Sequence, residues 1–187
     1  MDGSNPSVRH RRKLLQEQMS EVDKLLWWVI PDALAGMPMP FVHPERRLNE
    51  GGNLADYDDE LPSLYKAGVR AVVSLLNIPS DAQIYESAGF AFHCLPVPDG
   101  GAPTIDQVSG FVRFVSEQLA ISHPVAVHCE AGLGRTGTLV AAYLISQGHS
   151  AKSAIQRVRS IENVAVETAA QIRFLEDYER EFENRKT

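Results

Sequence analysis

The sequence predicts an α/β fold: a single domain with a central, twisted, mostly parallel sheet and helices on both of its faces. The main observation is an alternation of short β-branched, apolar runs with longer segments whose apolar residues recur every three or four positions. A second observation is the length, because 187 residues suit one domain with a sizeable core. We expect residues 1–26 to be an N-terminal extension with an accessory helix, and residues 27–187 to be the folded domain.

Turn and capping residues set the expected boundaries in the first half of the chain. Pro31 ends the first strand, because proline has no N–H to donate to a sheet. Gly68 and Gly89 stop helices, and Asp81 is expected to cap a short one. The expected helices cover 7–26, 53–68 and 81–88, and the expected strands cover 27–30, 34–36, 69–76 and 90–97.

The second half of the chain contains one short strand and four helices. The apolar run 124–127 is too short for a helix and is rich in valine, so it predicts a buried strand. Thr104 and Ser150 are expected helix caps. The expected helices cover 105–121, a segment that begins at 134 or 135, 151–161 and 166–185.

Composition narrows the functional classes. The formal net charge is −6, so extended binding to nucleic acid or to an anionic membrane is not expected. No apolar run is long enough to cross a bilayer, and the basic N-terminus lacks the apolar core of a signal peptide, so we expect a cytoplasmic protein. The histidines and the two cysteines show no metal-ligand spacing, so no metal is expected.

One stretch carries the chemistry: the strand 124–127 runs through His128 into Cys129, a glycine-bearing loop and a helix start. Free N–H groups at a helix N-terminus bind anions and stabilise a cysteine thiolate. Arg135 can fold back beside the sulfur and hold two oxygens of an anion. These features predict a thiolate nucleophile directed at phosphorus. The alternative is a structural cysteine in a turn.

The departing oxygen of a phosphate ester needs a proton, which calls for a carboxylic acid on a mobile loop. Asp99, between two prolines and two glycines, is the candidate, although Asp-Gly is also a common turn pair. Asp106 lies in the first turn of a helix and suits the helix dipole instead. The Thr136 hydroxyl could bind the thiolate and help it leave when water hydrolyses a phospho-cysteine, or it could simply belong to the start of a helix. His128 is interpreted as a buried residue that bonds the loop backbone.

The run from His128 to Thr138, HCEAGLGRTGT, resembles the signature of the cysteine-based protein tyrosine phosphatase superfamily. Residues 97–101, VPDGG, look like the general-acid loop of that superfamily. The chain is most similar to small atypical dual-specificity phosphatases and to archaeal-type tyrosine phosphatases. The resemblance implies their fold, no cofactor, and hydrolysis of phosphotyrosine, and also of phosphoserine or phosphothreonine, in proteins through a phospho-cysteine intermediate.

The resemblance also assigns roles to single residues. It implies that Cys129 is the nucleophile, Arg135 the phosphate clamp, and Asp99 the acid and then the base. Gln171 matches a glutamine that positions the hydrolytic water in some relatives, or is a polar residue on the last helix. The residues expected to bind phosphate through backbone N–H groups are Glu130, Ala131, Gly132, Leu133 and Gly134.

Three questions stay open at the sequence level. The same mechanism could act on phosphoinositides, soluble inositol phosphates or RNA 5′ phosphates, although Glu130, next to the nucleophile, disfavours highly charged substrates. An inactive phosphate-binding module is the weaker alternative. The strand that carries Cys94 is expected to neighbour Cys129, which would allow a transient disulfide.

Overall fold

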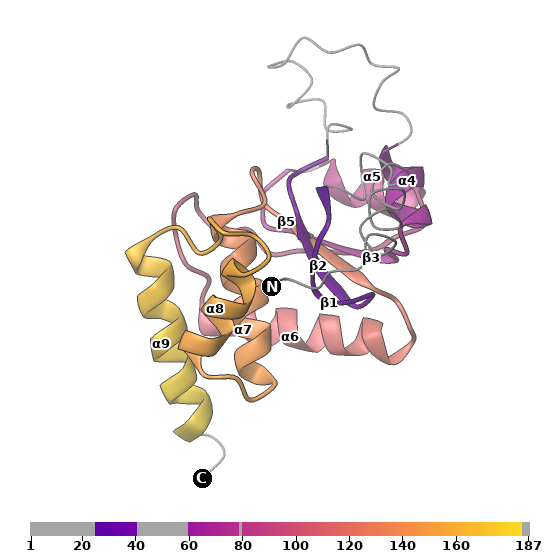
Figure 1. The fold of residues 1–187 in the computed structure, drawn as a ribbon. Coiled ribbons are helices and arrows are strands. Elements are labelled where there is room, and N and C mark those ends of the chain that lie inside the picture. Colours follow the sequence, from indigo (N-terminus) through magenta and orange to yellow (C-terminus); the bar gives the residue numbers. More distant parts are fainter. Residues whose placement is uncertain (1–24, 41–59, 79, 185–187) are drawn as a thin grey trace, which may run out of the picture.

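A five-stranded sheet forms the centre of the computed structural model, which describes residues 25–40, 60–78 and 80–184 (Figure 1). The strand order is β1-β2-β5-β3-β4. Strand β1 is antiparallel to β2, and the other three pairings are parallel. The strands are β1 Trp27–Ile30, β2 Leu34–Met37, β3 Ala71–Ser74, β4 Ala91–Cys94 and β5 Val125–His128. The predicted α/β fold with a mostly parallel central sheet is therefore confirmed.

Helices cover both faces of this sheet (Figure 1). Successive residues of β5 point to opposite faces, so Val125 and Val127 join one apolar core and Ala126 joins the other. Helices α4 and α5 pack on the Ala126 side, and the other helices pack on the valine side. The helices are α4 Glu60–Lys66, α5 Asp81–Ser87, α6 Ile105–Ala120, α7 Gly134–Ser146, α8 Ala151–Arg159 and α9 Ala169–Asn184.

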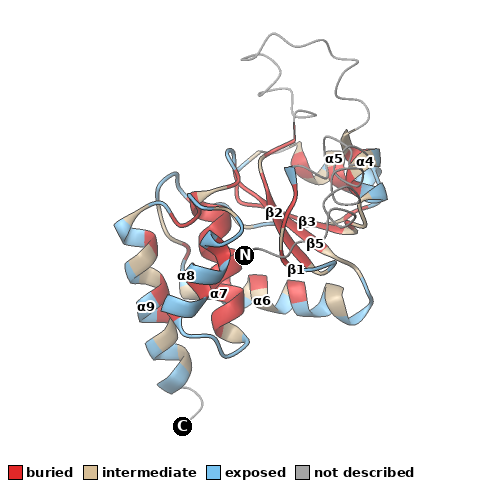
Figure 2. Cartoon of the chain, viewed as in Figure 1, coloured by how far each residue is buried: buried red, intermediate tan, exposed pale blue. Residues whose placement is uncertain are grey.

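Helix α7 is the central helix of the larger core. It is buried along almost its whole length, from Gly134 to Ile145, whereas α6, α8 and α9 each bury one face (Figure 2). A helix that is apolar on all sides is stable only inside a core. Its neighbours α6, α8 and α9 enclose it, and the sheet closes the remaining side. The start of α7 is thereby fixed relative to the sheet.

Most element boundaries agree with expectation to within a few residues. The caps Thr104 and Ser150 are confirmed, each accepting a backbone N–H from the third residue of its helix. The strands expected over 69–76 and 90–97 are shorter, and the last helix begins at Ala169 because Val166 has φ = 60°. The expected helix over 7–26, apart from its last two positions, and residues 53–59 of the next expected helix lie outside the described residues.

The prediction that Asp81 caps a helix is wrong. Ser80 occupies the cap position of α5, and Asp81 is the first helical residue. Its carboxylate is buried and accepts a hydrogen bond from the Ser74 hydroxyl at 2.6 Å. This contact joins α5 to the end of β3, which a local capping signal cannot reveal.

The expectation that the strand carrying Cys94 lies next to Cys129 is also wrong. Strand β3 lies between β4 and β5, so that Ser74 is paired with Cys94 on one side and with His128 on the other. Two strand spacings amount to about 10 Å, which exceeds the ~7 Å limit between the Cα atoms of a disulfide. Both cysteines are free thiols. Burial and the nearby Asp81 raise the pKa of the Cys94 thiol.

The surroundings of His93 predict that the free energy of unfolding falls in acid. Its ring stacks on Phe114 with centroids 4.9 Å apart, and its buried Nε2 atom has no hydrogen-bond partner among the described residues. Burial, and then Arg113, lower its pKa from the usual value, although Glu117 opposes this shift. The unfolded chain therefore binds the proton first, so stability falls as the pH drops through about 6.5.

We expect His93→Phe, which keeps the stacked ring, to flatten this part of the stability curve. Urea unfolding between pH 5 and pH 8 measures it. The exposed His149, changed to Gln, is the control and should leave the acid-side slope as it is. Equal slopes in wild type and His93→Phe would contradict the interpretation.

Candidate active site

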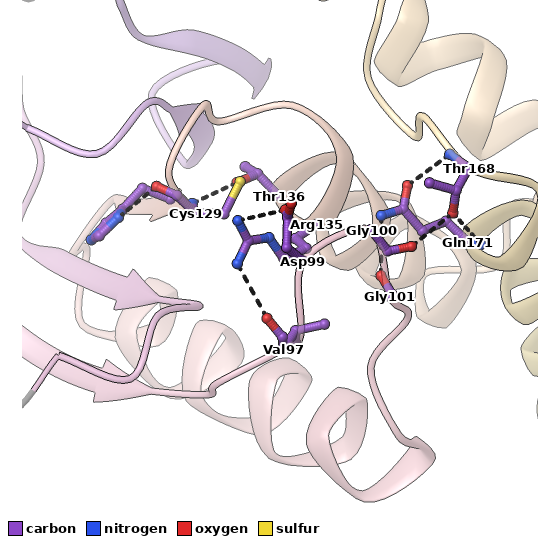
Figure 3. A network of polar contacts seen from close by, with 10 residues as sticks. Val97, Asp99, Gly100, Gly101, Cys129, Arg135, Thr136, Thr168 and Gln171 are labelled. Atoms are coloured by element: carbon purple, nitrogen blue, oxygen red, sulfur yellow. Dashed lines mark hydrogen bonds and ion pairs between the residues drawn. The ribbon is translucent and has the colours of Figure 1, made fainter.

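Cys129 lies at the carboxyl edge of the sheet, directly after the central strand β5 (Figure 3). Strands β2, β3 and β5 run parallel, so their carboxyl ends meet at this edge, where ligands bind in open α/β sheets. The Cys129 side chain is buried, with 2% of the residue exposed. Residues 130–133 form the loop that leads into α7, as the sequence predicts.

The loop and the first turn of α7 lie very close to neighbouring parts of the chain at three glycines. Gly132 has φ = 75°, and a Cβ atom there would overlap the carbonyl group of Met37 at the end of β2. A Cβ on Gly134 would overlap the Glu167 carboxylate. A Cβ on Gly137 would lie only 2.8 Å from that of Ala165. The glycines of the motif therefore seat the loop between β2 and the segment that precedes α9.

Thr136 connects the two ends of the loop through a buried hydrogen bond. Its buried hydroxyl oxygen accepts a hydrogen bond from the backbone N–H of Cys129 at 2.9 Å (Figure 3). The contact joins the first turn of α7 to the cysteine itself. The sequence predicts a contact between this hydroxyl and the Cys129 thiolate, and the structure shows a contact with the backbone N–H of Cys129. Its proposed help to the departing sulfur stays a prediction.

His128 is fully buried, as expected, and bonds the loop backbone. Its Nδ1 lies 3.1 Å from the carbonyl oxygen of Cys129, and its Nε2 lies 2.9 Å from the Tyr85 hydroxyl. Burial, and then Asp81 and Glu60, raise the pKa of Tyr85 well above its usual value, so the phenol stays protonated. A neutral His128 that donates from Nδ1 and accepts at Nε2 satisfies both contacts. Both imidazole nitrogens of His128 are therefore used in hydrogen bonds, one of which fixes the backbone of Cys129.

Arg135 lies in the first turn of α7 and is nearly buried, with 7% of the residue exposed. One guanidinium nitrogen forms an ion pair with an Asp99 carboxylate oxygen at 2.9 Å. The other donates to the carbonyl oxygen of Val97 at 3.2 Å (Figure 3). The structure therefore brings together Arg135 and Asp99, which are far apart in sequence, beside the Cys129 loop.

Asp99 sits at the tip of a tight turn. The N–H of Gly101 donates to the carbonyl oxygen of Pro98 at 2.9 Å, and Gly100 has φ = 67°. Such a positive φ is what the third position of a type II turn requires. The Asp99 side chain is 90% exposed, so it is open to an incoming substrate.

Gln171 lies beside the same turn, with 1% of the residue exposed. Its amide nitrogen donates to the carbonyl oxygen of Gly101 at 3.1 Å, and its amide oxygen accepts from the N–H of Thr168 (Figure 3). A Cβ on Gly134 would also meet this amide, so Gln171 touches both the acid-bearing turn and the cysteine loop. Its proposed contact with a hydrolytic water stays a prediction.

The remaining loop residues differ in exposure. Gly132 and Gly134 are buried and Leu133 is half-buried, whereas the side chains of Glu130 and Ala131 face solvent. The carbonyl oxygen of Glu130 accepts a hydrogen bond from the N–H of Met39 at 2.9 Å, so this carbonyl points toward the segment after β2. Binding of phosphate by the N–H groups of 130–134 stays a prediction.

Sequence reasoning missed two residues at the site. Tyr85, the partner of His128, lies 43 positions away, and no local signal identifies it. The other is Gln107: its capping-box spacing with Thr104 is visible in the sequence, but its contact with the carbonyl oxygen of Pro96 is not. No cluster of three or more histidine, cysteine, aspartate or glutamate side chains is placed to hold a metal ion within residues 25–40, 60–78 and 80–184. None of the helices in those ranges is long and apolar enough to cross a membrane.

The chain is similar in sequence to known protein families and proteins. Residues 48–149 match the family described as "Polymorphic toxin system, DSP-PTPase phosphatase". The chain is 34% identical over 118 residues to the dual specificity protein phosphatase CDC14C of Symphalangus syndactylus, covering 63% of this chain and 23% of that protein. It is 28% identical over 130 residues to the probable protein tyrosine phosphatase type IVA A of Dictyostelium discoideum, covering 66% and 78% respectively. The chain spans less than a quarter of the length of the CDC14C relative.

Solved structures agree. The active form of Tk-PTP superposes with a TM-score of 0.67 at 29% identity, covering 83% of this chain and 97% of that one. PTPMT1 in complex with PI(5)P gives a TM-score of 0.69 over 87% and 99% of the two chains, but at 22% identity this shows the fold alone.

Gly132 predicts a loss of both stability and activity on substitution. In Gly132→Ala the methyl group would meet the backbone of Met37 and the left-handed φ would be strained. We expect the strain to cost about 1–2 kcal/mol and the overlap a further 1–3 kcal/mol or so, with turnover falling too. Gly148→Ala is the matched control, because Gly148 has φ = 97° and open space around it, and it should show the strain alone. Equal losses of unfolding free energy in the two variants would contradict the close approach.

Proposed function

This chain belongs to the cysteine-based protein tyrosine phosphatase superfamily, as a member like the atypical dual-specificity phosphatases, and from that premise we propose that it hydrolyses phosphate monoesters of proteins through a phospho-cysteine intermediate. The observation that carries the proposal is the Asp99–Arg135 ion pair beside the buried Cys129. A nucleophile, a cation for the phosphate and an acid for the leaving group are then present at one sheet edge.

In the first step, the Cys129 thiolate attacks phosphorus and the bond from phosphorus to the ester oxygen breaks. Arg135 binds two non-bridging oxygens, with the guanidinium giving up its contact with Asp99. Once this contact opens, Asp99 takes a proton from solvent, and it then gives that proton to the departing oxygen. The products of this step are an alcohol or phenol and a phospho-cysteine.

In the second step, a water molecule attacks the phosphorus of the phospho-cysteine. Asp99, now a carboxylate, takes a proton from this water. The bond between sulfur and phosphorus breaks, and the electron pair returns to Cys129 as thiolate. Inorganic phosphate leaves, and the enzyme is restored without a cofactor.

The charges around the site favour substrates with a single phosphate. The exposed side chain of Glu130 follows the nucleophile, and the Glu167 carboxylate lies against Gly134. A second phosphate close to the scissile one would be repelled by these groups. Phosphotyrosine, phosphoserine and phosphothreonine in proteins carry only one phosphate, so they are the proposed substrates.

The first experiment changes the nucleophile. We expect Cys129→Ser to lower turnover of p-nitrophenyl phosphate and of phosphopeptides by about a thousandfold or more, because a serine hydroxyl is a much weaker nucleophile than a thiolate. Cys94→Ser is the matched control and should keep full activity, since Cys94 lies two strands away. A Cys129→Ser variant with wild-type turnover would rule out the thiolate mechanism.

The same assay separates the alternatives. A panel of phosphopeptides, a phosphoinositide, a soluble inositol phosphate and an RNA 5′ phosphate reports the substrate class, and fastest turnover of a polyphosphorylated member would overturn the preference for a single phosphate. Tight binding of phosphopeptide without turnover by the wild-type protein would indicate an inactive phosphate-binding module.

The second experiment tests the acid. We expect Asp99→Asn to lower turnover of an alkyl phosphate by about a hundredfold or more, with a smaller change in KM, because the proton is needed in the transition state. An aryl phosphate with a good leaving group should be affected less. Asp106→Asn, an exposed carboxylate in the first turn of α6, is the control and should change neither. Unchanged turnover of alkyl phosphate by Asp99→Asn would remove this residue from the mechanism.

A further inference from the structure

The turn that carries Asp99 is fastened on both sides of that residue. We define the acid turn as residues 96–101. Four of its backbone carbonyls accept hydrogen bonds from side chains of α6, α7 and the start of α9. The bonds run from Gln107 Nε2 to Pro96 at 2.7 Å, Arg135 to Val97 at 3.2 Å, Thr168 Oγ1 to Gly100 at 3.0 Å and Gln171 Nε2 to Gly101 at 3.1 Å.

Two of these four bonds come from glutamines that also cap the start of their own helices. Helix α6 begins with Thr104 and has Gln107 at its third position, and the glutamine oxygen accepts from the threonine N–H at 2.8 Å. Helix α9 begins after Thr168 and has Gln171 at its third position, with the equivalent distance 3.1 Å. In each case the threonine hydroxyl accepts from the glutamine N–H at 3.2 Å. These reciprocal pairs are capping boxes.

Glutamine gives these capping boxes a second use. A capping box needs only an acceptor at its third position, so glutamate would serve equally well for the helix. An amide whose oxygen is held by the cap still has N–H groups to donate, whereas a carboxylate has none. In both boxes that amide nitrogen donates to the acid turn, to Pro96 from one side and to Gly101 from the other.

Asp99 itself has little else to fix its position. Its side chain is 90% exposed, and the ion pair with Arg135 must open when phosphate binds the guanidinium. The backbone of the acid turn then determines where the carboxyl group lies. This backbone remains bonded to Gln107, Thr168 and Gln171, none of which has to release it for the reaction.

We propose that Gln107, Thr168 and Gln171 are positioning residues that hold Asp99 over the phosphate site by binding the carbonyls on either side of it. The proposal rests on the phosphatase function proposed above. The acid turn is then set in its working position before substrate arrives, and it does not need to close over the site in each catalytic cycle.

The test uses variants that separate capping from positioning. Gln107→Glu keeps the capping box of α6 and removes the donor to Pro96. Thr168→Val removes the hydroxyl that bonds Gly100, and Thr168→Ser restores it. For Gln107→Glu and Thr168→Val we expect turnover of an alkyl phosphate to fall about five- to tenfold, as for the loss of one hydrogen bond, with little change in KM. An aryl phosphate with a good leaving group should be turned over at nearly the wild-type rate, and Thr168→Ser should behave as wild type.

A double-mutant cycle with Asp99→Asn ties the effect to the acid. If the residues act through Asp99, Thr168→Val should have no further effect on turnover once Asp99 is asparagine. Ser150→Ala, which removes the cap of α8 away from the site, controls for the loss of a helix cap and should leave turnover unchanged. Additive losses in the cycle, or equal losses for alkyl and aryl phosphate, would overturn the proposal.

Amide hydrogen exchange keeps this test separate from that of the proposed function. We expect faster exchange at Asp99, Gly100 and Gly101 in Thr168→Val and Gln107→Glu, and wild-type exchange in Ser150→Ala. Unchanged exchange in all three variants would overturn the positioning role whatever the activity. A wild-type protein that hydrolyses no phosphate monoester would overturn the proposed function, even if these exchange rates changed as expected.

Discussion

The conformation of the loop after Cys129 depends on close approach to neighbouring parts of the chain, and glycine makes that approach possible at three positions. Gly132 lies against the backbone at the end of β2, Gly134 against the side chains of Glu167 and Gln171, and Gly137 against Ala165. An added Cβ atom would overlap backbone at Gly132, whereas at Gly134 it would displace the end of the Glu167 side chain. Because β5 is central and α7 is buried on all sides, the loop between them has rigid supports at both of its ends.

Local signals predicted the elements well, and long-range contacts limited the rest. The caps at Thr104 and Ser150 could be predicted because donor and acceptor lie within one helical turn. The order of the strands could not, so Cys94 was placed one strand too close to Cys129. A run of apolar residues shows that a strand is buried but not which strand lies beside it. The partner of Asp81 was missed for the same reason.

In the candidate site too, local features could be predicted from the sequence and long-range contacts could not. Cys129 and Arg135 could be identified together, because their geometry depends on one short loop and one helix start. Asp99 could be suggested from its turn, but its pairing with Arg135 depends on how two distant segments meet. The two threonine–glutamine pairs are visible in the sequence as capping boxes. That their amides bind the acid turn follows only from α6 and α9 beginning at the same edge of the sheet.

The ion pair between Arg135 and Asp99 gives the guanidinium an anion from within the chain, the Asp99 carboxylate. Any phosphate that enters has to compete with this carboxylate for the guanidinium. After phosphate departs, the ion pair forms again once Asp99 has lost the proton that it takes up in the proposed second step. Part of the attraction between the cation and its ligand is thus cancelled by the chain itself. Under the hydrolysis proposed above, this exchange lowers the affinity for inorganic phosphate, so release of the product is eased and inhibition by accumulated phosphate is weakened.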